Sequence, residues 1–232
     1  MPVERDKTIY SYYESESPIA TELRRLYHNI RTTVDGISPK SFMVTSSNRG
    51  EGKSTIASNL ALTIAQFPKK KVLLIDADLR RPRLHEIYGV GLDEGLRECL
   101  ESSIDPMTVV KETELPNLQI ITAGKTSASP GKLFESEVLS EVMKKVAFYY
   151  DVVLVDSAPV LAVSDTLFLV SEIDRVMLVV LAGVTPREVV TRARNILLDS
   201  HARIGGVVLN NASSALPYYY DYKYYGTYRK KK

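Results

Sequence analysis

The segment that most constrains this chain is residues 41–56, where a short β-prone run leads through a glycine-bearing loop into Gly52-Lys53-Ser54-Thr55 at the start of a helix-periodic stretch. That strand–loop–helix order is what a phosphate-binding loop requires. Its glycines let backbone N–H groups point toward phosphate oxygens, and the helix N-terminus adds positive potential. Ser47 stands where the usual pattern has its first glycine. We therefore expect a nucleotide site here, and the alternative is an ordinary glycine loop.

Composition limits the classes of protein to which this loop can belong. The chain has 232 residues, 44% of them hydrophobic, which is enough for the core of one α/β domain. Its formal net charge of +2 gives no overall bias toward nucleic acid or membrane. The single cysteine, Cys99, excludes a disulfide framework and an iron–sulfur centre. The first residues are unlike a signal peptide and no apolar run is long enough to span a membrane, so we expect a cytoplasmic chain. The alternative is the cytoplasmic domain of a longer membrane protein.

Short, continuously apolar runs alternate with helix-periodic stretches along the rest of the chain. Such runs are typical of strands buried on both faces of a parallel sheet, and their alternation with helices predicts βαβ units. We therefore expect a single α/β domain of the P-loop NTPase type, with a doubly wound, mostly parallel sheet and helices on both faces. The expected strands are 42–45, 72–75, 118–121, 152–155, 176–180 and 204–209.

Three parts of the chain differ in composition. Residues 1–16 are polar and rich in tyrosine, which predicts a flexible N-terminal arm. The P-loop domain is expected over 17–214, where Ser17-Pro18 should start a helix that runs to about Thr33. Residues 215–232 should form a tyrosine-rich tail. Inside the domain, one helix is expected from Leu133 to Tyr149, whereas 92–117 indicates only a short helix and a turn.

Two of the apolar runs end in aspartate, at Asp76 and Asp156. Ligands of a doubly wound sheet collect at the carboxyl ends of its strands, so we expect both aspartates beside the phosphate-binding loop. Asp156 can hold Mg²⁺ through its water shell, and Asp76 can orient or deprotonate an attacking hydroxyl. Asp78 is expected to bind metal or to position Asp76, and Arg80 to stabilise a transferring phosphoryl group. The alternative is structural, with these side chains capping the turns that follow the strands.

Three segments together resemble the bacterial tyrosine kinases, which control capsule and exopolysaccharide export. They are Gly-Glu-Gly-Lys-Ser-Thr at 50–55, Leu-Ile-Asp-Ala-Asp-Leu-Arg-Arg-Pro at 74–82 and Val-Asp-Ser-Ala-Pro at 155–159. In that family the three are called Walker A, Walker A′ and Walker B. The resemblance extends from about Ile19 to the C-terminus, and 129–133 is similar to the family's proline-containing segment.

The resemblance implies a protein-tyrosine kinase that uses ATP and Mg²⁺. Lys53 and Ser54 would then hold phosphate and Mg²⁺, with Asp76 as the general base. Asn210 lies where related proteins contact adenine, and a turn or helix cap is the equal alternative. The expected catalytic residues are Lys53, Asp76, Asp78 and Arg80. The expected nucleotide-binding residues are Gly50, Glu51, Gly52, Lys53, Ser54, Thr55 and Asn210, and the expected metal ligands are Ser54, Asp76, Asp78 and Asp156.

Half of the chain's 14 tyrosines fall within a short C-terminal stretch that has no aliphatic residue, so we expect a solvated tail there. The resemblance implies that this cluster is the autophosphorylation substrate, presented to a neighbouring copy of the chain. The alternatives are a low-complexity aromatic tail and a stacking surface for nucleic acid. The expected phosphoacceptors are Tyr218, Tyr219, Tyr220, Tyr222, Tyr224, Tyr225 and Tyr228.

The resemblance also implies partners. We expect a homo-oligomer, an activator that is a membrane protein of polysaccharide export, recruitment to the inner face of the membrane, further tyrosine substrates and no nucleic acid. The family's ring-forming Glu-x-x-Arg-x-x-Arg motif falls on Thr21, Arg24 and Tyr27, where only the arginine matches. A shift of one residue places it on Glu22, Arg25 and His28 and retains two of the three, so ring assembly stays open. Two other functions stay open as well. One is a partitioning-type switch ATPase, disfavoured because Asn48 replaces its signature lysine, and the other is a nucleotide-binding adaptor phosphorylated by another kinase.

Overall fold

The computed structural model of the chain describes residues 8–32, 38–125, 130–135 and 137–212. Its strands are β1 (Ser41–Ser46), β2 (Val72–Asp76), β3 (Lys111–Glu112), β4 (Leu118–Ile121), β5 (Val152–Asp156), β6 (Arg175–Leu181) and β7 (Ile204–Asn210). They form one seven-stranded sheet in the order β3-β4-β2-β5-β1-β6-β7. Neighbours pair in parallel except β3 and β4, which are antiparallel. The predicted doubly wound, mostly parallel sheet is therefore confirmed.

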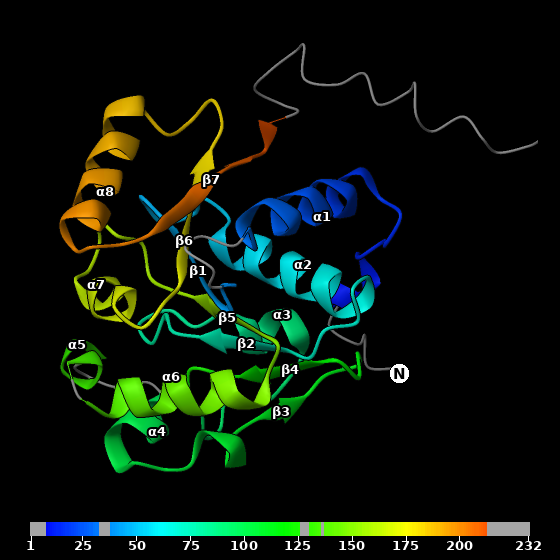
Figure 1. Cartoon of the computed structure of the whole chain (residues 1–232), viewed down its shortest axis with the longest axis vertical. Coiled ribbons are helices and arrows are strands. Elements are labelled where there is room, and N and C mark those ends of the chain that lie inside the picture. The colour runs from blue at the N-terminus through cyan, green and yellow to red at the C-terminus, as the bar shows by residue number, and fades with distance from the viewer. Residues whose placement is uncertain (1–7, 33–37, 126–129, 136, 213–232) are drawn as a thin grey trace, which may run out of the picture.

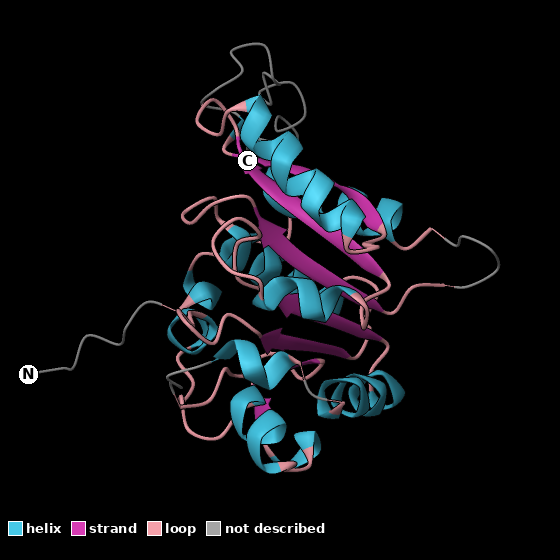
Figure 2. Cartoon of the chain, turned by 90° about the vertical axis from the view of Figure 1, so that its left-hand side faces the viewer, coloured by secondary structure: helices cyan, strands magenta, loops and turns pink. Residues whose placement is uncertain are grey.

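Helices cover both faces of the sheet (Figures 1 and 2). On one face lie α1 (Pro18–Ile30), α2 (Lys53–Gln66) and α3 (Leu84–Tyr88). On the other lie α4 (Leu96–Ser102), α5 (Pro130–Phe134), α6 (Val138–Tyr149), α7 (Asp165–Val170) and α8 (Arg187–Asp199). Two short 3-10 helices, Ile9–Ser11 and Pro106–Thr108, complete the regular elements of the described residues.

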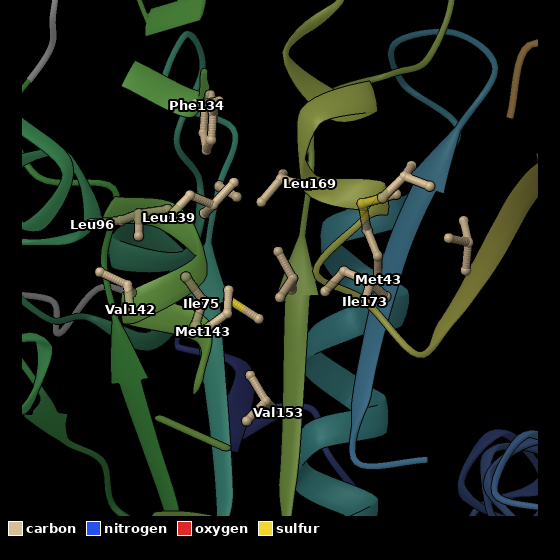
Figure 3. Packing of buried hydrophobic residues seen from close by; sticks show 14 of the residues in the cluster. Met43, Ile75, Leu96, Phe134, Leu139, Val142, Met143, Val153, Leu169 and Ile173 are labelled. Atoms are coloured by element: carbon tan, nitrogen blue, oxygen red, sulfur yellow. The ribbon is translucent and has the colours of Figure 1, made fainter. Parts of the chain in front are cut away.

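The central strands are buried on both faces, as their apolar runs predicted. Every residue of β1, β2 and β5 is buried. Successive side chains alternate between the two layers, so that Phe42 and Val44 pack under α1 and α2 whereas Met43 packs with α6 and α7. Figure 3 shows this second layer, in which Met43 lies near Ile173 and Ile75 near Met143. The packing fixes the ends of β1, β2 and β5 side by side.

Part of the segment expected to be a flexible arm is packed against the domain. The Tyr13 hydroxyl lies 3.0 Å from Thr63 Oγ1 of α2, and the Glu114 N–H donates to the Tyr10 hydroxyl over 3.2 Å. The Tyr10 ring meets the Tyr88 ring edge to face, with centroids 5.7 Å apart. The polar composition of this segment concealed the aromatic contacts that hold residues 8–16. The predicted Ser17 cap is confirmed, since Ser17 Oγ accepts the Ala20 N–H over 3.2 Å.

Other element boundaries differ from expectation as well. The single helix expected from Leu133 to Tyr149 is two helices, α5 and α6, and α7 lies in a stretch where no helix was expected. The region 92–117 holds α4, a 3-10 turn and the short antiparallel strand β3. Within the part of the chain that the structure describes, no helix has the length and apolar character needed to cross a membrane.

Candidate active site

The loop between β1 and α2 has the backbone of a phosphate-binding loop. Gly50 and Gly52 have φ angles of 80° and 90°, in the left-handed region that favours glycine. A Cβ atom at Gly52 would also lie 2.1 Å from Asn210 Nδ2, so the position requires glycine for space. Helix α2 begins at Lys53, and its first N–H groups have no partner within the helix. The loop and the helix start are therefore arranged to bind an anion.

Lys53 joins this loop to two of the predicted carboxylates. Its Nζ lies 3.0 Å from Asp78 Oδ2 and 3.8 Å from Asp156 Oδ1, and it is 3.4 Å from the hydroxyl of Ser54. Burial by itself would lower the pKa of Lys53, but the charges of Asp156 and Asp78 outweigh burial and raise that pKa. The ammonium group therefore stays charged in the site.

Asp76 is fully buried and held by the backbone. Its Oδ2 accepts the N–H groups of Arg83 and Leu84, each at 3.0 Å, and its Oδ1 accepts the N–H of Asp78 at 3.2 Å. Burial, followed by the charge of Asp156, raises the pKa of Asp76 despite these bonds. The two aspartates face each other in register at the ends of β2 and β5. Asp76 is thus rigidly placed and more basic than an ordinary carboxylate.

Asp156 has the same burial and none of these bonds. It is fully buried, and neither of its carboxylate oxygens accepts a hydrogen bond from the described residues. Burial raises the pKa of Asp156, and the charge of Lys53 and the nearby Ser54 hydroxyl only partly offset this effect. A buried carboxylate with free lone pairs is costly unless a cation or a proton joins it. No cluster of three or more His, Cys, Asp or Glu side chains suited to a metal occurs in the described ranges. A cation here would therefore depend on few protein ligands, as Mg²⁺ does.

Arg80 is bound to a partner that the sequence analysis missed. Its Nε donates to Asp165 Oδ2 over 2.6 Å and its Nη2 to Asp165 Oδ1 over 3.1 Å, a two-bond pair. Asp165 is the first residue of α7 and is almost completely buried, whereas the Arg80 side chain is 41% exposed. The guanidinium group is therefore fixed at the mouth of the site by α7. No local signal marked Asp165, because its helix lay outside the expected elements.

The side chains of Glu51 and Asn210 form hydrogen bonds that hold the loop in place and face away from the nucleotide cavity. The buried carboxylate of Glu51 accepts the Asn48 N–H over 3.0 Å and the Thr185 hydroxyl over 2.6 Å. Asn210 Nδ2 donates to the carbonyl oxygen of Glu51 over 3.0 Å. Thr185 is thus a second residue that the sequence analysis missed. Together these bonds connect the loop to the ends of β6 and β7.

A cavity of about 630 Å³ opens beside the loop. Its walls come from the loop, from the segment after β2 and from the segment after β5. They include Gly50, Gly52, Lys53, Ser54, Thr55, Asp78 and Arg80. Glu51 and Asn210 do not line it, and the fully buried Asp76 and Asp156 do not reach its surface. The structure therefore brings the predicted residues to one place, in an inner group of carboxylates and an outer group that faces the cavity. The predicted phosphoacceptors, Tyr218 to Tyr228, lie outside the described residues.

Comparison with known proteins agrees with this geometry. A family model described as an AAA domain matches residues 40–185. The tyrosine-protein kinase YwqD of Bacillus subtilis is 35% identical over 205 residues, which cover 87% of this chain and 85% of that protein. The chain belongs to the bacterial tyrosine-protein kinase family. The resemblance inferred from the three Walker segments is confirmed.

Solved structures share this fold, among them the kinase domain of a tyrosine kinase. The chimerical protein CapA2B2 is 29% identical with a TM-score of 0.81, over 87% of this chain and 88% of that one. The kinase domain of the Escherichia coli tyrosine kinase ETK is 26% identical with a TM-score of 0.80, over 90% of this chain and 84% of that one. The chain is therefore a nucleotide-binding tyrosine kinase by family, and the roles of its individual residues stay predictions.

Proposed function

We propose that this tyrosine kinase transfers the γ-phosphoryl group of ATP to the C-terminal tyrosine cluster of another copy of the chain. The observation that carries the proposal is the position of Lys53 between Asp78 and Asp156, beside the fully buried Asp76. That arrangement supplies a cation for phosphate and a carboxylate of raised pKa within one site. Family membership supplies the acceptor class, because tyrosine kinases modify phenol hydroxyls.

Catalysis in this proposal is mainly positioning and charge neutralisation. The loop N–H groups and Lys53 bind the phosphates of ATP. Arg80, fixed by Asp165, faces the same cavity and stabilises charge on the transferring group. The proton of the tyrosine hydroxyl passes to Asp76, the phenol oxygen bonds the γ-phosphorus, and ADP leaves as the bridging P–O bond breaks. Burial and the charge of Asp156 raise the pKa of Asp76, which makes its carboxylate form a stronger base than an ordinary aspartate.

Mg²⁺ fits the residues that surround Asp156. Ser54 and Asp156 would hold it, with Asp78 as a further oxygen ligand, because Asp156 has two buried oxygens without hydrogen bonds. When bound, Mg²⁺ neutralises negative charge on the phosphate oxygens. Lys53 lies near both Asp78 and Asp156, so the lysine and these carboxylates form a mixed-charge site for a metal–nucleotide complex.

The wider role of the chain rests on its family. We place it in the control of capsule or exopolysaccharide synthesis and export, at the inner face of the membrane, with a membrane-protein activator. The homo-oligomer belongs to the same proposal, because transfer between copies needs two chains to meet. A tail of 20 residues beyond Ala212 reaches roughly 65 Å when extended, which is enough to enter a neighbouring site.

The test is phosphotyrosine formation by the purified full-length chain with Mg²⁺ and ATP. We expect phosphorylation of the intact chain, loss of the signal in Lys53→Met, and loss in a variant whose seven tail tyrosines are phenylalanine. Lys40→Met, which changes an exposed lysine away from the cavity, is the matched control and should behave as the intact chain. Labelling of the Lys53→Met chain by the intact chain in a mixture would establish transfer between copies.

Other outcomes separate the competing functions. Signal that persists without the tail tyrosines would move the acceptor elsewhere and overturn the proposal. Phosphate release without phosphotyrosine would favour a switch ATPase. Phosphotyrosine that appears only after another kinase is added would favour the adaptor.

A further inference from the structure

A second cavity lies away from the nucleotide site, among α5, α6 and α7. Its volume is about 880 Å³, against about 630 Å³ for the cavity beside the phosphate-binding loop. Four apolar side chains line it, namely Phe134 of α5, Leu139 of α6, and Leu167 and Phe168 of α7. We name it the α5–α7 groove. Two of its four apolar residues are aromatic, which suits an aromatic side chain that enters it.

The rim of the groove is acidic. Glu135, Glu137, Glu141 and Glu172 line it, together with the single basic residue Lys144. None of the four glutamates forms an ion pair with a described residue. This concentration of negative charge contrasts with the chain's net charge of +2. A ligand for the groove should therefore combine aromatic groups with several positive charges.

The groove shares a helix with the active site. Helix α7 begins at Asp165, which binds Arg80 at the nucleotide cavity, and the same turn carries Leu167 and Phe168, which line the groove. One turn of helix advances only about 5.4 Å. Figure 1 shows α5 and α7 next to each other at one side of the molecule, and the two helices are in contact. The groove is therefore connected to the nucleotide cavity through α7 and its Asp165–Arg80 pair.

The chain contains a segment with the matching chemistry. Its C-terminal stretch has seven tyrosines over 218–228, followed directly by Arg229-Lys230-Lys231-Lys232. We propose that the α5–α7 groove binds the basic end of this stretch from a second copy of the chain and so presents its tyrosines to the active site. The inference rests on the proposed transfer between copies. With 229–232 held in the groove, the preceding eleven residues can extend for up to about 35 Å.

Phosphorylation would also end the interaction. Each phosphate adds about −1.5 to −2 charges beside the basic residues, so the tail becomes acidic after a few transfers. An acidic tail is repelled by the four glutamates of the groove. The groove therefore selects the unphosphorylated tail and releases the product.

The experiment is a charge exchange between two full-length chains. The acceptor chain carries Lys53→Met and an intact tail, and the catalytic chain carries phenylalanine at its seven tail tyrosines. Changing Glu135, Glu141 and Glu172 of the catalytic chain to lysine should raise the KM for the acceptor about tenfold, with little change in kcat. Changing Lys230, Lys231 and Lys232 of the acceptor to glutamate should do the same. Combining both sets should restore most of the original KM.

The control is Glu114→Lys, which reverses an exposed glutamate after β3 and should leave the KM unchanged. An unaltered KM in the groove variant, or a failure of the paired charge reversals to restore it, overturns the inference. If the KM is restored only when both sets of charge changes are made in the same chain, the groove binds the chain's own tail. That result also overturns the inference. Absence of acceptor phosphorylation by the unaltered pair would overturn the proposed function instead. Thermal unfolding of each variant separates a binding defect from a folding defect.

Discussion

The two edges of the sheet use aspartate in opposite ways. At the amino edge, Asp174 Oδ2 accepts the N–H groups of Lys40 and Ser41, at 2.8 and 2.9 Å, and the Ser41 hydroxyl at 3.0 Å. Burial acts to raise the pKa of Asp174, but these bonds outweigh it and lower that pKa. At the carboxyl edge, Asp156 is fully buried, lacks such bonds and has a raised pKa.

The difference shows that one of these aspartates stabilises the fold and that the other reduces its stability. A carboxylate that accepts backbone N–H bonds at the start of two strands joins those strands together. A buried carboxylate with free oxygens destabilises the nucleotide-free protein and is prepared for a cation. Asp76 lies between these cases, because it accepts three backbone N–H bonds and still has a raised pKa. Changes at the two edges should therefore have opposite effects on stability and activity.

The largest expected effect comes from Asp156→Asn. We expect tyrosine phosphorylation to fall about a thousandfold, because the carboxylate that would hold Mg²⁺ is neutralised. The nucleotide-free protein should become more stable at pH 8, by about 1 kcal/mol, because a buried charge is removed while Lys53 keeps Asp78 as its partner. Kinase assays and urea unfolding measure the two quantities. Asp151→Asn makes the same change at the amino edge and should leave activity intact. If the Asp156→Asn protein were less stable but fully active, the contrast drawn between Asp156 and Asp174 would be wrong.

The second prediction concerns pH. The pKa of Asp156 is raised to about 6 in the folded protein, against about 3.9 for an ordinary aspartate. A raised carboxyl pKa contributes stability that is fully present below pH 4 and is lost as pH rises through 6. The advantage of Asp156→Asn at pH 8 should therefore shrink by about 1 kcal/mol, to near zero, at pH 5, where most of the native side chain is protonated. Free energies of unfolding of both proteins between pH 5 and pH 8 test this prediction. A stability advantage of Asp156→Asn that does not change with pH would contradict a raised pKa for Asp156.

At the amino edge we expect a loss of stability without a loss of chemistry. Asp174→Ala removes the acceptor of two backbone N–H groups and one hydroxyl, so the free energy of unfolding should fall by about 2 kcal/mol. Asp174→Asn keeps an oxygen in the same position and should cost less than half as much. The kcat of both folded variants should match that of the unaltered chain. A kcat that changed with Asp174 would show that this edge also takes part in catalysis.

The smallest expected effect tests which contacts at the amino edge contribute to the free energy of unfolding. Lys70 Nζ lies 3.9 Å from Asp151 Oδ1, and both side chains are nearly half exposed. Such a pair contributes little in water, so Lys70→Gln should change the free energy of unfolding by less than about 0.5 kcal/mol. Chemical denaturation at low and moderate salt measures it. A loss as large as that of Asp174→Ala would mean that exposed charge pairs stabilise this edge as strongly as backbone bonds do.

Local sequence determined the main features of the fold and the place of the site. Continuous apolar runs specified strands buried on both faces, and the glycines before Lys53 specified a loop that binds anions. Since the carboxyl ends of parallel strands meet at one edge, the aspartates after β2 and β5 could be placed together without coordinates. These inferences needed only patterns a few residues long and one rule of topology.

Only the tertiary structure decided what each of these side chains contacts. The Arg80–Asp165 pair joins residues 85 apart in the chain, and the Glu51–Thr185 bond joins residues 134 apart. The tertiary structure also decided that Asp76 accepts backbone hydrogen bonds whereas its neighbour in register, Asp156, accepts none. The packing of Tyr10 and Tyr13 on the domain is another feature that only the tertiary structure decided. The physical reason is that hydrogen-bond partners and burial depend on which distant segments are packed together, and no short pattern in the sequence records that.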